Sequence, residues 1–94
     1  MPVRLVITVQ ATPGKGPELA EAMKAYCLAA SQEPGCKQFE LFQSAHEPEK
    51  LVVLELWADQ AALDAHAERN AAHPPTIPPG LRASGEREDY TFES

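Results

Sequence analysis

The sequence predicts an α+β domain of the ferredoxin-like type, with strands and helices in the order β-α-β-β-α-β. Two segments, residues 3–10 and 50–58, are rich in β-branched and aliphatic residues, as the strands of a sheet are. Each is followed by a segment in which apolar residues recur at helical spacing. Proline, glycine and acidic residues separate these segments and keep every element short.

The first strand and the first helix follow from the pattern of residues 3–30. Residues 3–10 nearly alternate, so this strand has one apolar face, formed by Val3, Leu5, Ile7 and Val9. Residues 12–16 contain a proline and glycines and end the strand. Pro17 suits the first turn of a helix, where a backbone N–H has no partner to lose. The apolar side of this helix consists of Leu19, Met23, Tyr26, Cys27 and Ala30.

Pro34 and Gly35 end the first helix. Proline disfavours the helical conformation in the residue before it, and glycine tolerates the left-handed backbone that often follows a helix. A second strand is expected over residues 36–44, and residues 45–49 have the length of a hairpin loop.

The third strand, residues 50–58, is the most apolar part of the chain and has two usable faces. One face carries Val52, Leu54 and Leu56, and the other carries Leu51, Val53 and Trp57 with Glu55 among them. Asp59 is a good N-cap for a second helix of about three turns. Residues 70–75 end this helix.

The C-terminal part is expected to be a proline-rich loop followed by a last strand. The loop has two interpretations over residues 74–80: a lid that gates a cleft, or a rigid connector that closes one end of a barrel. The last strand is expected over residues 85–92, with Tyr90 and Phe92 on one face.

The apolar residues on both faces of the third strand predict a homodimer. Two helices form a single layer and cover only one face of a four-stranded antiparallel sheet. A second copy of the chain, stacked sheet against sheet about a two-fold axis, would cover the other face. The alternative is a monomer whose C-terminal segment folds across the sheet.

Length and composition exclude several classes of function. The chain has 94 residues, so residues 1–94 are expected to form a single domain. The formal charge of −6 and the lack of a basic run argue against nucleic acid as a partner. No segment is apolar enough to cross a membrane and the N-terminus lacks a signal-peptide pattern, so a cytoplasmic location is expected. Cys27 and Cys36 are too few for a disulfide framework or a zinc site and are expected to be reduced.

Three short motifs give the sequence a resemblance to a known family: Glu-Pro-Gly-Cys at residues 33–36, Glu-x-Trp at residues 55–57 and Ala-x-x-Ala-His at residues 62–66. In these motifs the chain resembles the antibiotic biosynthesis monooxygenase family over residues 3–70, and within it the quinol-monooxygenase-like members of the dimeric α+β barrel superfamily. Such proteins include cofactor-independent oxygenases of quinols and aromatic polyketides, haem-degrading enzymes and proteins acting on small signalling molecules.

The haem-degrading branch fits the residues poorly. Its members resemble one another in an Asn on the first strand, a Trp in the second helix and a later His that binds iron. Here the first strand has Thr8 and Gln10 but no Asn, His66 stands where the Trp would be, and His73 is a loose match for the ligand. The resemblance therefore implies no haem, no other organic cofactor and no metal.

The cofactor-free branch implies an oxidoreductase in which a quinol or phenol is deprotonated and its anion reduces dioxygen directly. The protein must supply a base, a dry pocket and orientation. His66 is the candidate base because an imidazole exchanges protons near neutral pH. Trp57 is the second candidate catalytic residue, as an aromatic wall whose indole N–H can hold an oxygen. The candidate substrate-binding residues are Tyr26, Glu55 and Leu63.

Competing interpretations accompany these residues. His66 can be a half-buried histidine satisfied by one hydrogen bond. Tyr26 can be an amphipathic core residue whose hydroxyl reaches water. Trp57 can simply fill the core or a dimer seam. Glu55, on an otherwise apolar face, can point to the rim, pair across the dimer with Arg4 or Lys37, or have a raised pKa and act as an acid or base. The cross-dimer ion pair is the favoured interpretation of Glu55.

Three functions remain open from the sequence. The leading hypothesis is a cofactor-independent monooxygenase acting on a quinol or another electron-rich phenolic molecule, with dioxygen and a second copy of the chain as partners. The second is a non-catalytic dimeric module that binds a small ligand. The third is an enzyme acting on a small carbonyl or hydroxy signalling molecule, with Cys36 or His66 as acid or base.

Overall fold

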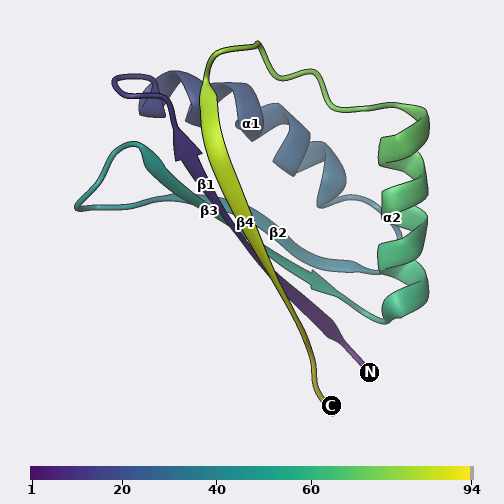
Figure 1. The fold of residues 1–94 in the computed structure, drawn as a ribbon. Coiled ribbons are helices and arrows are strands. Elements are labelled where there is room, and N and C mark those ends of the chain that lie inside the picture. The colour runs from purple at the N-terminus through teal and green to yellow at the C-terminus, as the bar shows by residue number, and fades with distance from the viewer. Residues whose placement is uncertain (94) are drawn as a thin grey trace.

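A computed structural model describes residues 1–93 and contains four strands and two helices in this range. In chain order they are β1 (Val3–Ala11), α1 (Gly16–Ala30), β2 (Cys36–Gln43), β3 (Lys50–Trp57), α2 (Gln60–Ala72) and β4 (Arg82–Thr91) (Figure 1). This order confirms the predicted β-α-β-β-α-β fold. The last strand begins at Arg82 rather than at Gly85, because its pairing with β1 continues past the glycine to an irregularity between Gln10 and Ala11.

The strands form one antiparallel sheet in the order β2-β3-β1-β4, so β1 and β3 are its central pair. Val3 lies opposite Trp57, and Leu5 lies opposite Glu55. Side chains that lie directly opposite each other on neighbouring strands share a face of the sheet. The end of β3 therefore presents Glu55 and Trp57 on the same face as the apolar residues of β1.

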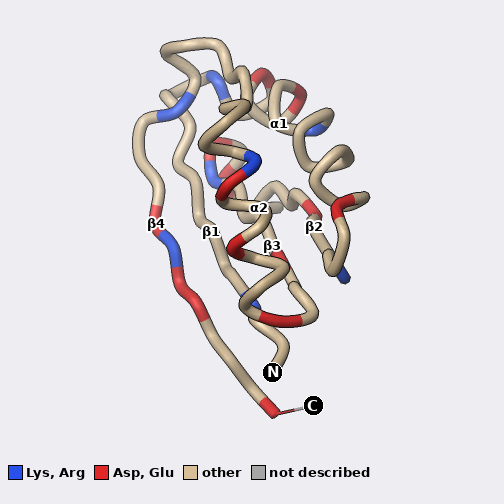
Figure 2. Tube along the Cα trace, turned by 90° about the vertical axis from the view of Figure 1, so that its right-hand side faces the viewer, with Lys and Arg blue, Asp and Glu red and all other residues tan. Residues whose placement is uncertain are grey.

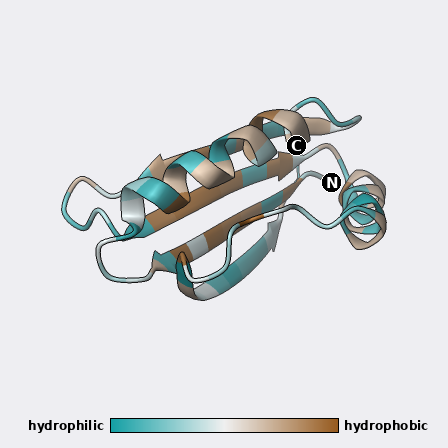
Figure 3. Ribbon diagram, turned by 90° about the horizontal axis from the view of Figure 1, so that it is seen from above, coloured by the Kyte–Doolittle hydropathy of each residue, from teal (hydrophilic) through white to brown (hydrophobic). Residues whose placement is uncertain are grey.

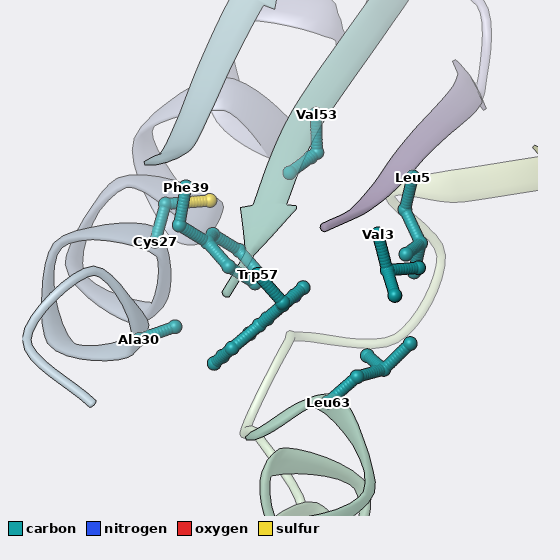
Figure 4. Packing of buried hydrophobic residues seen from close by; sticks show 8 residues of the cluster. All are labelled: Val3, Leu5, Cys27, Ala30, Phe39, Val53, Trp57 and Leu63. Atoms are coloured by element: carbon teal, nitrogen blue, oxygen red, sulfur yellow. The ribbon is translucent and has the colours of Figure 1, made fainter. Parts of the chain in front are cut away.

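Both helices lie on this face. Seen from above, α1 runs along the sheet, whereas α2 stands at one end and is viewed along its axis (Figure 3). Trp57 projects from the end of β3 into the space between the two helices, among the residues drawn in Figure 4. This part of the core consists of Val3, Leu5, Cys27, Ala30, Phe39, Val53, Trp57 and Leu63.

Gly35 allows α2 to approach the turn between α1 and β2. Its φ of +81° lies in the left-handed region that favours glycine. A Cβ atom at this position would lie 2.5 Å from the Cβ of Ala62 in α2. The turn therefore packs directly against α2 at Gly35, where there is no space for a side chain.

The opposite face of the sheet carries apolar residues that neither helix covers. Val52, Leu54 and Leu56 are half-buried there, as the alternation in β3 predicts. Phe42 and Tyr90 are 44% and 51% exposed. Residues 82–91 join the edge of the sheet as β4, so they do not fold across this face.

Charged residues gather on β4 and on the outer sides of the helices, while β1 carries only Arg4 (Figure 2). Within residues 1–93, neither helix is long and apolar enough to span a membrane.

Candidate functional site

Helix α2 places His66 over the end of the sheet. The helix begins at Asp59, whose side chain accepts a hydrogen bond from the backbone N–H of Ala62 at 2.9 Å and thereby confirms the predicted N-cap. Leu63, His66 and Asn70 follow at spacings of three and four residues and so share one face of the helix. That face is turned toward the sheet, and His66 as a whole residue is only 5% exposed.

Glu33 fixes the orientation of the His66 ring. Its Oε1 atom lies 2.9 Å from Nδ1 of His66 and also accepts a hydrogen bond from Arg69, one turn further along the same helix. A carboxylate only accepts hydrogen bonds, so Nδ1 carries the hydrogen. In the neutral imidazole the other nitrogen, Nε2, is then a hydrogen-bond acceptor.

Nε2 of His66 faces two hydrogen-bond donors. The amide Nδ2 of Asn70 lies at 3.2 Å and the hydroxyl of Tyr26 at 3.4 Å, and the same amide donates to the Tyr26 hydroxyl at 2.9 Å. Burial is the main cause that raises the pKa of Tyr26, so its hydroxyl keeps its proton at neutral pH. Nε2 is therefore the proton-accepting atom of this group.

Aromatic rings enclose the other sides of His66. Trp57 is fully buried, and its ring centre lies 4.8 Å from that of His66 at an angle of 34°. Phe39 lies 5.5 Å from His66 and meets Trp57 edge to face at 6.3 Å. This packing excludes water from one side of the imidazole and limits its rotation.

The indole N–H of Trp57 is already engaged. It donates to Oε1 of Glu55 at 2.8 Å, so it does not hold a substrate oxygen as the sequence suggested. Trp57 is fully buried and does not line the cleft between the helices and the sheet. It lies beneath His66 as a supporting surface.

Glu55 is buried on the helix-covered face, and only 2% of the residue is exposed. Burial is the main cause that raises its pKa, although the Trp57 hydrogen bond acts in the opposite direction. The expected cross-dimer ion pair with Arg4 or Lys37 is wrong, because the carboxyl group faces the helices. Arg4 lies on the other face of the sheet, where it donates to Gln38.

These groups meet at a cleft of about 340 Å³ between α1, α2 and the sheet. Four of the five candidate residues line it: Tyr26, Glu55, Leu63 and His66. The remaining lining residues are Leu5, Ile7, Gln60, Asp64, Ala67, Asn70 and Arg87. The volume lies in the range of small-molecule sites, which is about 300–1,000 Å³.

A larger groove of about 520 Å³ lies elsewhere, between α1 and the edge strand β2. It is open, and it contains Cys27, whose pKa is raised to about 11 by burial. Burial also raises the pKa of Cys36, whose thiol lies 3.4 Å from the carbonyl of Gln38. Both thiols are free, as predicted, and both are poor acid–base groups near neutral pH. This disfavours the hypothesis that uses Cys36.

Three residues of the site escaped the sequence analysis. Asn70 follows His66 by four residues, so helical spacing alone places it beside the imidazole. Arg87 reaches the cleft through the pairing of β4 with β1, opposite Ile7. Glu33 belongs to a motif that the sequence analysis singled out, but nothing in the sequence connects it to His66.

Comparison with known proteins agrees with this geometry. No curated protein matches the chain significantly. Among solved structures, the chain is similar to PA3566 from Pseudomonas aeruginosa, with a TM-score of 0.80 and 24% identity over 99% of this chain and 95% of that chain. The protein SO0527 from Shewanella oneidensis gives 0.77 and 28%, with 95% and 88% covered. A conserved protein from Methanosarcina mazei Go1 gives 0.81 and 26%, with 99% and 94% covered.

The sequence profile described as "Antibiotic biosynthesis monooxygenase" matches residues 2–73, which include β1 to α2 and all the cleft residues except Arg87. The matched segment also contains the three motifs described above. The chain belongs to the antibiotic biosynthesis monooxygenase family.

Proposed function

We propose that this protein is a cofactor-independent monooxygenase that acts on a quinol or another electron-rich phenol. One observation carries the proposal: Nε2 of His66 is an acceptor at the cleft, while Glu33 holds the hydrogen on Nδ1. A base oriented by a carboxylate in this way is suited to take a proton from a bound hydroxyl group.

The reaction begins when Nε2 of His66 takes the phenolic proton. Tyr26 and Asn70 have donors beside this nitrogen and stabilise the negative charge that develops on the substrate oxygen. The anion transfers an electron to dioxygen, and the two radicals join to form a carbon–oxygen bond. The imidazolium returns its proton to the resulting peroxide.

The peroxide then breaks down. The O–O bond breaks, and the distal oxygen leaves with its proton and the hydrogen of the attacked ring carbon as water. A quinol and one dioxygen thus give a hydroxyquinone and one water, and no external reductant is needed. Burial of Trp57, Phe39 and Leu63 around the imidazole keeps bulk water from the reactive anion.

The proposal includes a homodimer. The half-buried and exposed apolar residues of the helix-free face would be covered by the same face of a second copy. Because the cleft lies on the helix-covered face, each protomer of such a dimer has its own cleft.

Oxygen consumption tests the proposed reaction. A panel of hydroquinones and anthrones is offered to the wild type, to His66→Ala and to His46→Ala, and each rate is corrected for autoxidation in buffer. His46 lies exposed in the loop before β3, so this variant is a control for loss of an imidazole outside the cleft. Uptake that requires His66 but not His46 supports the proposal, and uptake equal to buffer across the panel refutes it. Binding without uptake would identify a ligand-binding module instead.

A further inference from the structure

One oxygen of Glu55 has no hydrogen-bond partner within residues 1–93. Oε1 accepts the indole N–H of Trp57, but no donor is found for Oε2. Among the described residues, every side-chain oxygen or nitrogen that is closed off from open space has a hydrogen-bond partner. Oε2 of Glu55 has no partner among these residues, so it must be in contact with open space. Since Glu55 lines the cleft and is 2% exposed, the small exposed part of its carboxyl group faces the cleft.

Oε2 is therefore open to a hydrogen-bond donor from a molecule in the cleft. Arg87 also lines the cleft, but its guanidinium is engaged with Asp89 through two hydrogen bonds of 2.7 and 2.8 Å. An apolar side chain at this position would avoid the cost of desolvating a carboxyl group, so stability alone does not account for a glutamate.

Glu55 and His66 flank the same indole ring. The N–H of Trp57 binds Glu55, and the face of its ring packs on His66 with 4.8 Å between the centres. Both polar groups also line the same cleft. Glu55 and His66 are therefore two polar groups at separate points of one cleft, next to the same indole ring.

We infer that Glu55 is a second polar anchor, which accepts a hydrogen bond from a hydroxyl group at the far end of the ligand while His66 binds the near one. Glu55 then determines specificity: the cleft selects aromatic molecules with a hydroxyl at each end over analogues that can donate at one end only. This inference deepens the proposed function and rests on it for the identity of the near group.

Calorimetric titration without oxygen tests the inference, because no turnover occurs. Naphthalene-1,4-diol is compared with 4-methoxy-1-naphthol, which keeps both oxygens but cannot donate from the second. A hydrogen bond to a charged group contributes about 1.5–3 kcal/mol, so the wild type should prefer the diol by roughly 10- to 100-fold.

Two variants identify the group responsible. In Glu55→Gln the amide oxygen can still accept the indole N–H, but the amide NH2 group then faces the ligand. This group donates and does not accept, so the preference for the diol should fall to within about threefold. Glu68→Gln removes an exposed carboxylate of α2 outside the cleft and should leave the preference unchanged. Equal wild-type affinities for the two ligands, no binding of either, or an unchanged preference in Glu55→Gln would each overturn the inference.

The wild-type comparison decides the question even if Glu55→Gln does not fold. The outcome is also independent of catalysis. A preference that depends on Glu55 without any oxygen uptake refutes the monooxygenase and keeps the anchor. Oxygen uptake without a preference for the diol refutes the role of Glu55 as an anchor and leaves the monooxygenase proposal standing.

Discussion

Gly35→Ala tests whether the contact between the α1–β2 turn and α2 sets the position of the site. Gly35 adopts a φ of +81°, and a methyl group there would lie 2.5 Å from the Cβ of Ala62. Carbon atoms normally pack at about 3.5–4.0 Å, so α2 or the turn must move by about 1 Å. His66 lies on the same helix one turn beyond Ala62, and Glu33 lies in the turn, so such a movement lengthens the bond between them.

Gly35→Ala should lower the free energy of unfolding through two effects, backbone strain and overpacking. Gly14→Ala is a control that separates them. Forcing a left-handed backbone on alanine costs about 1–2 kcal/mol, partly offset by about 0.4–1 kcal/mol from the less flexible unfolded chain. Gly14→Ala should show this part alone, because its φ is +79° and a Cβ there meets nothing within 4 Å. Overpacking at Gly35 adds about 1–3 kcal/mol.

Urea unfolding measures the difference. With a slope of about 1 kcal/mol per molar urea, the midpoint of Gly35→Ala should lie roughly 1–3 M below that of Gly14→Ala. Adding Ala62→Gly removes the clashing methyl group and should recover most of the difference, although glycine in a helix costs about 0.5–1 kcal/mol by itself. Equal midpoints for the two glycine variants, or no recovery in the double variant, would refute the reasoning.

Three further predictions concern α2, the buried acid and the free sheet face. Asp59→Ala removes the N-cap and should lower the free energy of unfolding by about 1 kcal/mol in thermal denaturation; an unchanged melting temperature would contradict this role. Burial raises the pKa of Glu55, so the folded state binds its proton more tightly than the unfolded chain does. Wild-type stability should therefore fall relative to Glu55→Gln as pH rises from about 4 to 7, and a difference that stays constant in urea curves across this range would argue against it. Leu54→Lys places a charge on the helix-free face and should shift sedimentation from dimer to monomer; a wild type that already sediments as a monomer at micromolar concentration refutes the dimer.

Local pattern was sufficient to predict the fold. Alternation in β1 and β3, proline and glycine between the elements and an aspartate before α2 each act within a few residues, so the sequence displays them directly. The same reasoning placed Tyr26, Leu63 and His66 on faces that turn inward. The start of β4 was predicted less well because the strand is exposed throughout and has no apolar face to mark it.

The hydrogen bonds of the site were harder to predict because they depend on how the elements dock. Glu33 and His66 are 33 positions apart and meet only after the turn at Gly35 and the docking of α2 are fixed. The hydrogen bond from Trp57 to Glu55 could have been predicted from the sequence, because residues two apart on a strand share a face of the sheet. The ion pair expected between Glu55 and Arg4 failed because Arg4 lies on the other face of the sheet, whereas the alternation in β3 puts Glu55 on the face of Trp57.

The three motifs that carry the family resemblance form one contact unit. Glu33 of the first binds His66 of the third, Glu55 and Trp57 of the second bind each other, and Trp57 packs on His66. Residues that share partners in this way do not contribute independently, so substitutions in different motifs should combine non-additively. A change at Glu33 should alter the effect of a change at Trp57, because both act by holding the same imidazole. The resemblance therefore reflects a physical requirement: the turn, the strand end and the helix are needed together to hold one base at the cleft.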